Sequence, residues 1–118
     1  RYYIKIILKF VGILELVLDI KESYNFILKD GVIDFSDTIK NIDNQKDLVA
    51  SKFINSLVEV IKTISNEINL PIILSGGVFQ NKTLLTQILK NIDKKIYFNQ
   101  TTPINDGGIS LGQINFLL

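Results

Sequence analysis

Cysteine, histidine, methionine and tryptophan are all absent from this chain of 118 residues, and proline occurs only twice. Without cysteine the chain has no disulfide, no thiolate metal ligand and no cysteine nucleophile. Without histidine it lacks the commonest general base and the commonest metal ligand. Because methionine is absent and the sequence starts at Arg1, we expect a piece of something longer or a processed product.

A strong excess of charge is also missing, because 13 Lys and Arg residues stand against 12 Asp and Glu residues, a formal net charge of +1. This balance predicts neither a broad basic surface for nucleic acid nor an acidic tail. The length allows one domain at most, with a real core. A mean hydropathy of +0.27 favours a piece that packs against a neighbour.

Long apolar runs are absent even in the apolar first twenty residues, where charged residues leave residues 10–14 as the longest uncharged run. A bilayer span needs about 20 apolar residues. A signal peptide needs an apolar region of about 7–15 residues and a small-residue cleavage site. Neither is present, so we expect a buried helix or a domain edge here, in a cytoplasmic protein without a membrane partner.

Turn formers predict a hairpin after this apolar segment. The pair Asp30-Gly31 separates two β-prone runs, residues 24–28 and 32–35. Such a pair is typical of a type I′ turn, in which both central positions need positive φ. Residues 35–45 are polar and loop-like, with room for one helical turn.

The rest of the chain alternates between helix and strand patterns. Apolar residues three and four apart indicate helices, and short continuous apolar runs are typical of strands covered on both faces. The predicted elements are a helix over 47–69, a strand over 70–74, a helix over 79–92, a strand over 96–98 and a helix over 109–118. This series needs a helix-covered parallel sheet, so the fold class is α/β, and so few strands suggest half of a fold.

Two glycine pairs follow the two predicted parallel strands, Gly76-Gly77 after the first and Gly107-Gly108 after the second. Ligands bind at the carboxyl ends of such strands. Glycine lets the backbone approach a ligand, and a helix N-terminus supplies free N–H donors with partial positive charge. The pairs therefore predict a phosphate or nucleotide site. The alternative is two tight strand-to-helix turns that hold no ligand.

Asp106 lies in the loop before the last predicted helix. An aspartate there commonly caps the helix by accepting backbone N–H bonds. The functional interpretation is a carboxylate that binds a metal ion, or the cation accompanying a phosphate. A single aspartate does not hold a metal tightly, and without histidine or cysteine the other ligands must come from outside this chain.

Two motifs together resemble one family. Residues 74–81 read LSGGVFQN and residues 103–113 read PINDGGISLGQ. Both resemble the C-terminal end of the hydrogenase maturation carbamoyltransferase family, HypF, in their separation and in their distance from the C-terminus. The resemblance is firm over residues 24–118 and poor over residues 1–23. We therefore expect one partial domain over 1–118 with a poorly matched leader.

This resemblance implies a fold and an activity. The family's C-terminal domain belongs to the actin, sugar-kinase and Hsp70 superfamily, and the chain resembles its second half, a partly parallel sheet with flanking helices. The family uses carbamoyl phosphate and ATP to make carbamoyl-adenylate. It then passes the carbamoyl group to the terminal cysteine of an acceptor protein, HypE, for the cyanide ligand of nickel–iron hydrogenase. The implied partners are the first half of the same domain and a HypE-type acceptor.

The resemblance also implies site residues. In related enzymes that build threonylcarbamoyl-adenosine on tRNA, the asparagine matching Asn81 contacts the nucleotide. The aspartate matching Asp106 ligates a divalent metal (iron, zinc or magnesium) with two upstream histidines that this chain lacks. No catalytic residue is expected in this chain alone. The expected nucleotide-binding residues are Gly76, Gly77, Asn81, Gly107 and Gly108.

Two departures from the family pattern accompany the resemblance. Ile54 stands where the family usually has histidine, and a glycine- and glutamate-rich segment before the hairpin is not recognisable, with Glu15 as its only candidate remnant. The chain is then a gene fragment, a split reading frame or a trimmed version, expected to be inactive alone. The alternative from another class is a non-catalytic packing module, whose glycines are turns and whose long helix docks on a partner lobe.

Overall fold

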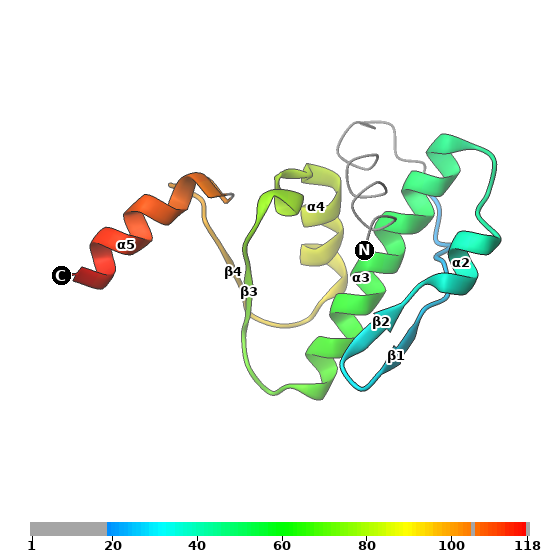
Figure 1. Ribbon diagram of the computed structural model, residues 1–118, viewed down its shortest axis with the longest axis horizontal. Helices are drawn as coiled ribbons and strands as arrows, with labels where there is room; N and C mark the ends of the chain where they lie inside the picture. The colour runs from blue at the N-terminus through cyan, green and yellow to red at the C-terminus, as the bar shows by residue number, and fades with distance from the viewer. Residues whose placement is uncertain (1–18, 105, 118) are drawn as a thin grey trace.

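The structure, a computed structural model, describes residues 19–104 and 106–117 (Figure 1). The helix or domain edge expected at the start of the chain therefore lies outside the described residues, apart from the last two of that segment. No helix in the described part of the chain is long and apolar enough to span a bilayer. The elements are β1 (Ile27–Lys29), β2 (Val32–Asp34), α2 (Ser36–Lys40), α3 (Lys46–Glu67), β3 (Ile72–Leu74), the 3₁₀ turn η1 (Gly77–Gln80), α4 (Lys82–Asn91), β4 (Ile96–Phe98), the 3₁₀ turn η2 (Asp106–Gly108) and α5 (Ile109–Leu117).

The predicted hairpin is confirmed. β1 and β2 pair antiparallel, with Lys29 opposite Val32 on either side of a two-residue turn. Both turn residues have positive φ, 51° at Asp30 and 74° at Gly31. This is the conformation that an Asp-Gly pair adopts at low cost in a type I′ turn. The single helical turn allowed after the hairpin is α2.

The long predicted helix is α3, whose buried face forms the core together with α4. Phe53, Ile54 and Val58 of α3 lie in one apolar cluster with Leu84 and Ile88 of α4. Ile54 is completely buried, so isoleucine suits this position. A histidine in the same place would need a buried hydrogen-bond partner, because an unpaired polar group is costly in an apolar core.

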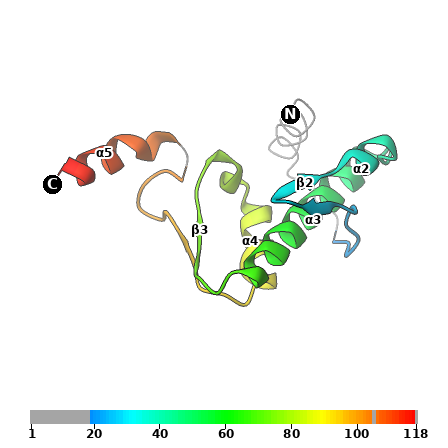
Figure 2. The same ribbon diagram turned by 60° about the horizontal axis from the view of Figure 1, so that its bottom comes forward.

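The two strands of the predicted strand–helix–strand unit pair in parallel, with α4 as the crossover between them (Figure 2). This confirms the α/β class. One face of the sheet packs on the helical core through Ile72, Leu74, Ile96 and Phe98.

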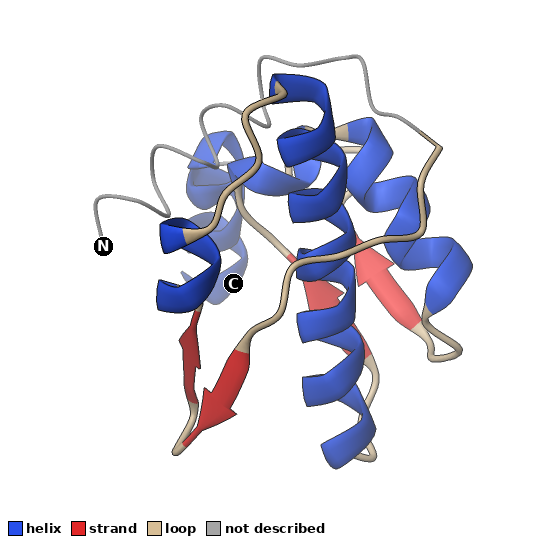
Figure 3. Ribbon diagram, turned by 90° about the vertical axis from the view of Figure 1, so that its right-hand side faces the viewer, coloured by secondary structure: helices blue, strands red, loops and turns tan. Residues whose placement is uncertain are grey.

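The expectation that these strands are covered on both faces is wrong for the described part of the chain. Ile73 and Tyr97 pair in register on the opposite face of the sheet, and they are 76% and 46% exposed. Helices α3 and α4 pack on a single face of the sheet, the face turned toward the viewer in Figure 3. A continuous run of apolar residues is typical of a strand that is covered on both faces of its sheet. The described residues supply the covering layer on only one of these faces.

The last predicted helix is α5, which extends away from the α3–α4 core (Figure 1). None of its residues is buried. It follows η2 directly along the chain, so it continues from the loop that carries Gly107 and Gly108.

Candidate functional site

The two loops predicted to form a site meet at one edge of the parallel sheet. The backbone N–H of Gly76, just after β3, donates a hydrogen bond of 2.8 Å to the carbonyl oxygen of Ile104 in the loop after β4. Because β3 and β4 run parallel, their carboxyl ends lie side by side. The structure therefore brings Gly76-Gly77 next to the loop that leads into Gly107-Gly108.

Gly76 is required by its backbone conformation. Its φ of 106° and ψ of 158° lie in a region that is essentially restricted to glycine. A Cβ placed on Gly76 would meet no atom within 4 Å, so neighbouring atoms do not crowd this position. Gly77 starts η1, and among the described glycines only Gly31 and Gly76 have positive φ.

Gly108 is tightly packed within its own loop. A Cβ at this position would lie 3.1 Å from the carbonyl oxygen of Pro103 and 3.7 Å from Nδ2 of Asn99. Asn99 Nδ2 also donates to that carbonyl, at 3.4 Å. The close approach at Gly108 is therefore to the chain itself, which favours the turn interpretation for this glycine. The contact of Asn99 with this loop was not predicted from the sequence. The feature that could have indicated it is an amide side chain directly after β4.

Asn81 is the N-cap of α4. Its Oδ1 accepts a hydrogen bond of 3.0 Å from the backbone N–H of Leu84, and its carbonyl accepts one from Leu85. This cap satisfies one of the N–H groups that a helix leaves unpaired in its first turn. It also fixes the start of α4 just after the Gly76-Gly77 turn, so the positive end of the helix lies near the sheet edge.

Asp106 is the exposed first residue of η2. It stands three residues before α5 rather than at the cap of that helix, because a 3₁₀ turn intervenes. Among the described residues, no three His, Cys, Asp or Glu side chains are grouped closely enough to hold a metal ion. In this part of the chain Asp106 is a single carboxylate, so the described residues do not supply a complete metal centre.

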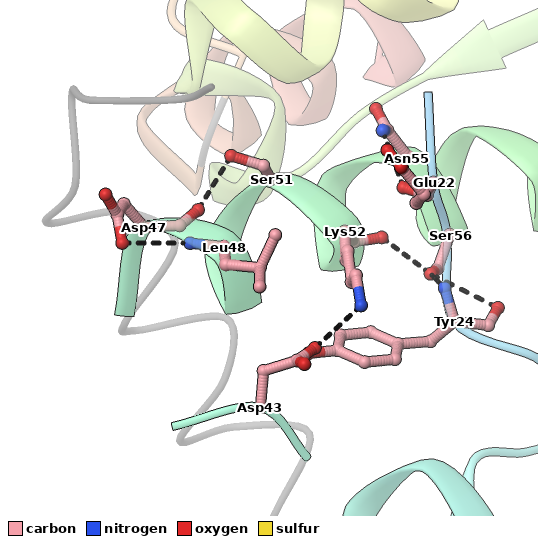
Figure 4. Close-up of polar contacts among 9 residues, drawn as sticks. All are labelled: Glu22, Tyr24, Asp43, Asp47, Leu48, Ser51, Lys52, Asn55 and Ser56. Carbon is pink, nitrogen blue, oxygen red and sulfur yellow. Dashed lines mark hydrogen bonds and ion pairs between the residues drawn. The ribbon is translucent and has the colours of Figure 1, made fainter. Parts of the chain in front are cut away.

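A separate polar network lies on α3 (Figure 4). Oδ2 of Asp43 accepts hydrogen bonds of 2.7 Å from the Tyr24 hydroxyl and 2.9 Å from Nζ of Lys52. Burial, and next the bond to Asp43, raise the pKa of Tyr24 to about 12. The bond from Lys52, and then that from Tyr24, lower the pKa of Asp43.

The same network ties the segment before the hairpin to α3. The backbone N–H of Tyr24 donates to Oγ of Ser56 at 2.7 Å, and Asn55 Nδ2 donates to the carbonyl of Ile20 at 2.9 Å. None of its members belongs to the glycine loops, so we assign the network a structural role. No sequence pattern indicates it, because Asp43 lies in a loop with no periodic relation to Tyr24 or Lys52.

The comparisons with known proteins agree with this geometry. Residues 13–113 match the model of the family described as "Carbamoyltransferase, Kae1-like Domain, second subdomain". The fold and the matched residues thus define the second subdomain of a carbamoyltransferase domain. The chain belongs to this family, and its relatives are HypF proteins.

Two relatives show how much of a HypF protein the chain represents. It is 37% identical to the carbamoyltransferase HypF of Synechocystis sp. over 90 residues, which take in 70% of this chain and 12% of that protein. A crystal structure of full-length HypF in the phosphate- and nucleotide-bound form matches with a TM-score of 0.70 and 26% identity, over 91% of this chain and 22% of that one. The chain therefore spans less than a quarter of the length of either relative.

Proposed function

We propose that this chain provides one wall of the nucleotide site of a HypF-type carbamoyltransferase. The observation that carries the proposal is the hydrogen bond from Gly76 to Ile104, which joins the two glycine loops at the sheet edge. Ligands of open α/β sheets bind at such an edge. The full-length HypF whose crystal structure matches this chain is itself in a phosphate- and nucleotide-bound form, which supports the proposal.

The role proposed for these residues is electrostatic. The turn at Gly76 leaves room for a ligand on its open side, and the start of α4 supplies partial positive charge for a phosphate. Preorganised donors of this kind stabilise charge that develops on a bound phosphate during transfer. No histidine or cysteine is available to take a proton from a thiol, so we expect the chain alone to be inactive.

The finer reaction follows from the family. The complete enzyme would transfer a carbamoyl group from carbamoyl-adenylate, made from carbamoyl phosphate and ATP, to the terminal cysteine of a HypE-type acceptor during hydrogenase maturation. Asp106 would add one ligand to a divalent metal ion only if other residues of the enzyme supplied the rest. Both statements are proposals that rest on the resemblance of the two motifs to HypF.

A non-catalytic packing module is the second candidate. Two of the residues expected at the nucleotide site have structural roles within the chain, Asn81 as a helix cap and Gly108 as a closely packed loop residue. If the remaining glycines were also no more than turns, the chain would need no nucleotide. A substitution at Gly76 separates the two candidates.

The experiment uses Synechocystis HypF with its matching region replaced by this chain, titrated with ATP by calorimetry. Gly76→Ala places a side chain in a backbone region that costs about 1–3 kcal/mol. We expect it to weaken one ATP-binding event by about tenfold or more. Gly31→Ala is the matched control, because Gly31 also has positive φ and open space around it but lies in the hairpin. Unchanged ATP binding in the Gly76 variant would contradict the proposed function.

A further inference from the structure

Helix α5 has a mainly apolar stripe along one side, and none of the helix is buried in the described chain. Residues three and four apart along the helix line a shallow groove: Ile109, Gly112, Gln113, Phe116 and Leu117. Phe116 is 91% exposed and Leu117 is 84% exposed. Figures 1 and 2 both show α5 extending away from the α3–α4 core. The spacing of the stripe is that of the contact between two packed helices.

Gly112 lies near the midpoint of this stripe, and nothing among the described residues requires a glycine there. Glycine is one of the least favourable residues within a helix. Gly112 does not have positive φ, and a Cβ placed on it would meet no atom within 4 Å. A residue without a side chain leaves a notch that lets another molecule approach the helix closely. The notch therefore indicates a partner that packs directly on α5.

The stripe is complementary to itself when two copies of α5 lie antiparallel. Large and small residues stand in opposite order on the two sides of the midpoint between Gly112 and Gln113. A two-fold axis through that midpoint places Phe116 of each copy opposite Ile109 of the other. It also places the long side chain of Gln113 over the notch at Gly112 of the other copy. In such an isologous contact the same patch serves both copies.

The charge and the exposed surface of the chain also suit a second copy. A two-fold contact brings identical groups together, so a charged stripe would repel itself, whereas α5 has no charged residue. The net charge of the whole chain is only +1, which opposes association little. The chain exposes 8993 Å², whereas a compact protein of 13.4 kDa exposes about 6,500 Å². The difference is larger than the surface of about 800 Å² that each partner contributes to a standard interface.

We infer that two copies of this chain form an antiparallel dimer through α5, with the two-fold axis between Gly112 and Gln113. This inference goes beyond the proposed function and does not depend on it, because no residue of the stripe is among those expected to bind the nucleotide. A helix of nine residues offers a small contact area. The dimer is therefore weak, with a dissociation constant of about 10–100 µM.

Sedimentation equilibrium of the 118-residue chain tests the dimer. The weight-average mass should rise from the monomer value of 13.4 kDa towards twice that value between about 5 and about 500 µM protein. Phe116→Lys places a charge against Ile109 of the other copy and should raise the dissociation constant at least about tenfold. Asn115→Lys adds the same charge outside the stripe and should change it less than about threefold. A monomer at every concentration, or equal effects of the two substitutions, would overturn the inference.

A mixture of two variants tests the antiparallel register. Ile109→Glu and Phe116→Lys should each weaken the dimer when studied alone. In a one-to-one mixture, the new carboxylate of one copy faces the new ammonium group of the other, and the second Ile109–Phe116 pair is unchanged. The mixture should therefore associate at least about fivefold more tightly than either variant alone. No gain on mixing would overturn the antiparallel arrangement.

Other occupants of the stripe give different results. A mass that rises beyond twice the monomer value would show open-ended association of the chain. Binding of a monomeric chain to phosphatidylcholine vesicles, lost in Phe116→Lys, would identify a lipid surface. Either result overturns the inference. ATP titration of the Synechocystis HypF chimera, in which this chain replaces the matching region, tests the proposed function separately, because the dimer is measured without nucleotide.

Discussion

The α3–α4 core and the C-terminal helix α5 both carry apolar residues, but the burial of these residues is opposite in the two regions. In the core, Ile54, Leu84 and Ile88 are 0%, 1% and 0% exposed. In α5, Ile114 is 55% exposed and no residue is buried. Apolar side chains pack against other apolar groups, and an exposed apolar surface is typical of a contact site. The core finds its neighbours within the chain, whereas α5 and the outer face of the β3–β4 sheet do not find them among the described residues.

The candidate site lies at the boundary between these two regions. Gly76 and the cap residue Asn81 belong to the end of the sheet that packs on the core, and Asp106 and Gly108 belong to the loop before α5. The hydrogen bond between Gly76 and Ile104 is the connection between them. The first half of the site should therefore persist in the isolated chain, and the second should depend on whatever covers α5.

The largest expected effect on the free energy of unfolding comes from replacing isoleucine by alanine in the core, compared with the same replacement in α5. Ile88→Ala removes a fully buried side chain from the core and should lower the free energy of unfolding by about 3 kcal/mol. Ile114→Ala removes the same atoms from α5 and should change it by less than about 0.5 kcal/mol. Urea unfolding of both variants of the isolated chain measures the difference. Equal losses would mean that α5 is packed in solution.

The periodic parts of the fold were predictable from the sequence. The hairpin turn, the limits of α3 and the position of β4 follow from local turn chemistry and apolar spacing. The exposed outer face of β3 was not predictable, since the apolar residues of a strand do not show whether the layer that covers each face belongs to the same chain. The same holds for Gly108, because its contact with Pro103 depends on the path of a loop.

Within the site, the sequence located the loops better than it assigned their roles. Gly76 was expected to contact a nucleotide, with a tight turn as the alternative; its positive φ is the conformation of such a turn, and its nucleotide contact stays a prediction. Asn81 was expected to contact a nucleotide, and its Oδ1 is committed to capping α4. A cap and a ligand contact require the same kind of side chain at the same helix terminus, so the residue type alone does not separate them.

Tyr24 provides the next largest effect, at the junction between the N-terminal segment and α3. Tyr24→Phe removes the hydroxyl that donates to Asp43 and should cost about 1.5 kcal/mol, as expected for a hydrogen bond to a charged group. Tyr97→Phe, on the exposed face of the sheet, is the control and should cost less than about 0.5 kcal/mol. Urea unfolding at pH 7 compares them.

The difference in unfolding free energy between wild type and Tyr24→Phe should change with pH in a definite direction. Tyr24 has a folded-state pKa raised from 10.0 to about 12, so its contribution to stability is fully present below pH 10 and is lost as the pH rises towards 12. The pKa of Asp43 is lowered from 3.8, so its contribution is present above that value and is lost as the pH falls through the folded-state pKa. The gap between wild type and Tyr24→Phe should narrow above pH 10; a constant gap would contradict the role of the hydroxyl.

Substitutions of Asn81 distinguish a role as helix cap from a role in nucleotide contact. Their effect on stability should be smaller than that of Tyr24→Phe. Asn81→Ala loses the bond to Leu84 and should destabilise the chain by about 1 kcal/mol. Asn81→Asp keeps a capping oxygen and should be nearly neutral. Its negative charge would repel a phosphate, so in the HypF chimera it should weaken ATP binding. If both variants bind ATP like the parent, Asn81 is a cap alone.

Asp106 should have the smallest effect on stability, because it is exposed and shows no hydrogen bond or ion pair with the described residues. Both Asp106→Asn and Asp106→Ala should leave the unfolding free energy within about 0.5 kcal/mol of the parent. In the chimera, loss of the carboxylate charge should lower the content of divalent metal, since the attraction of the ion to its ligands is largely electrostatic. Metal analysis and thermal melts of the same samples decide the point. Full metal content in the Asn and Ala variants would remove Asp106 from any metal site, and a destabilisation well above about 0.5 kcal/mol would show that it supports the loop between the two regions.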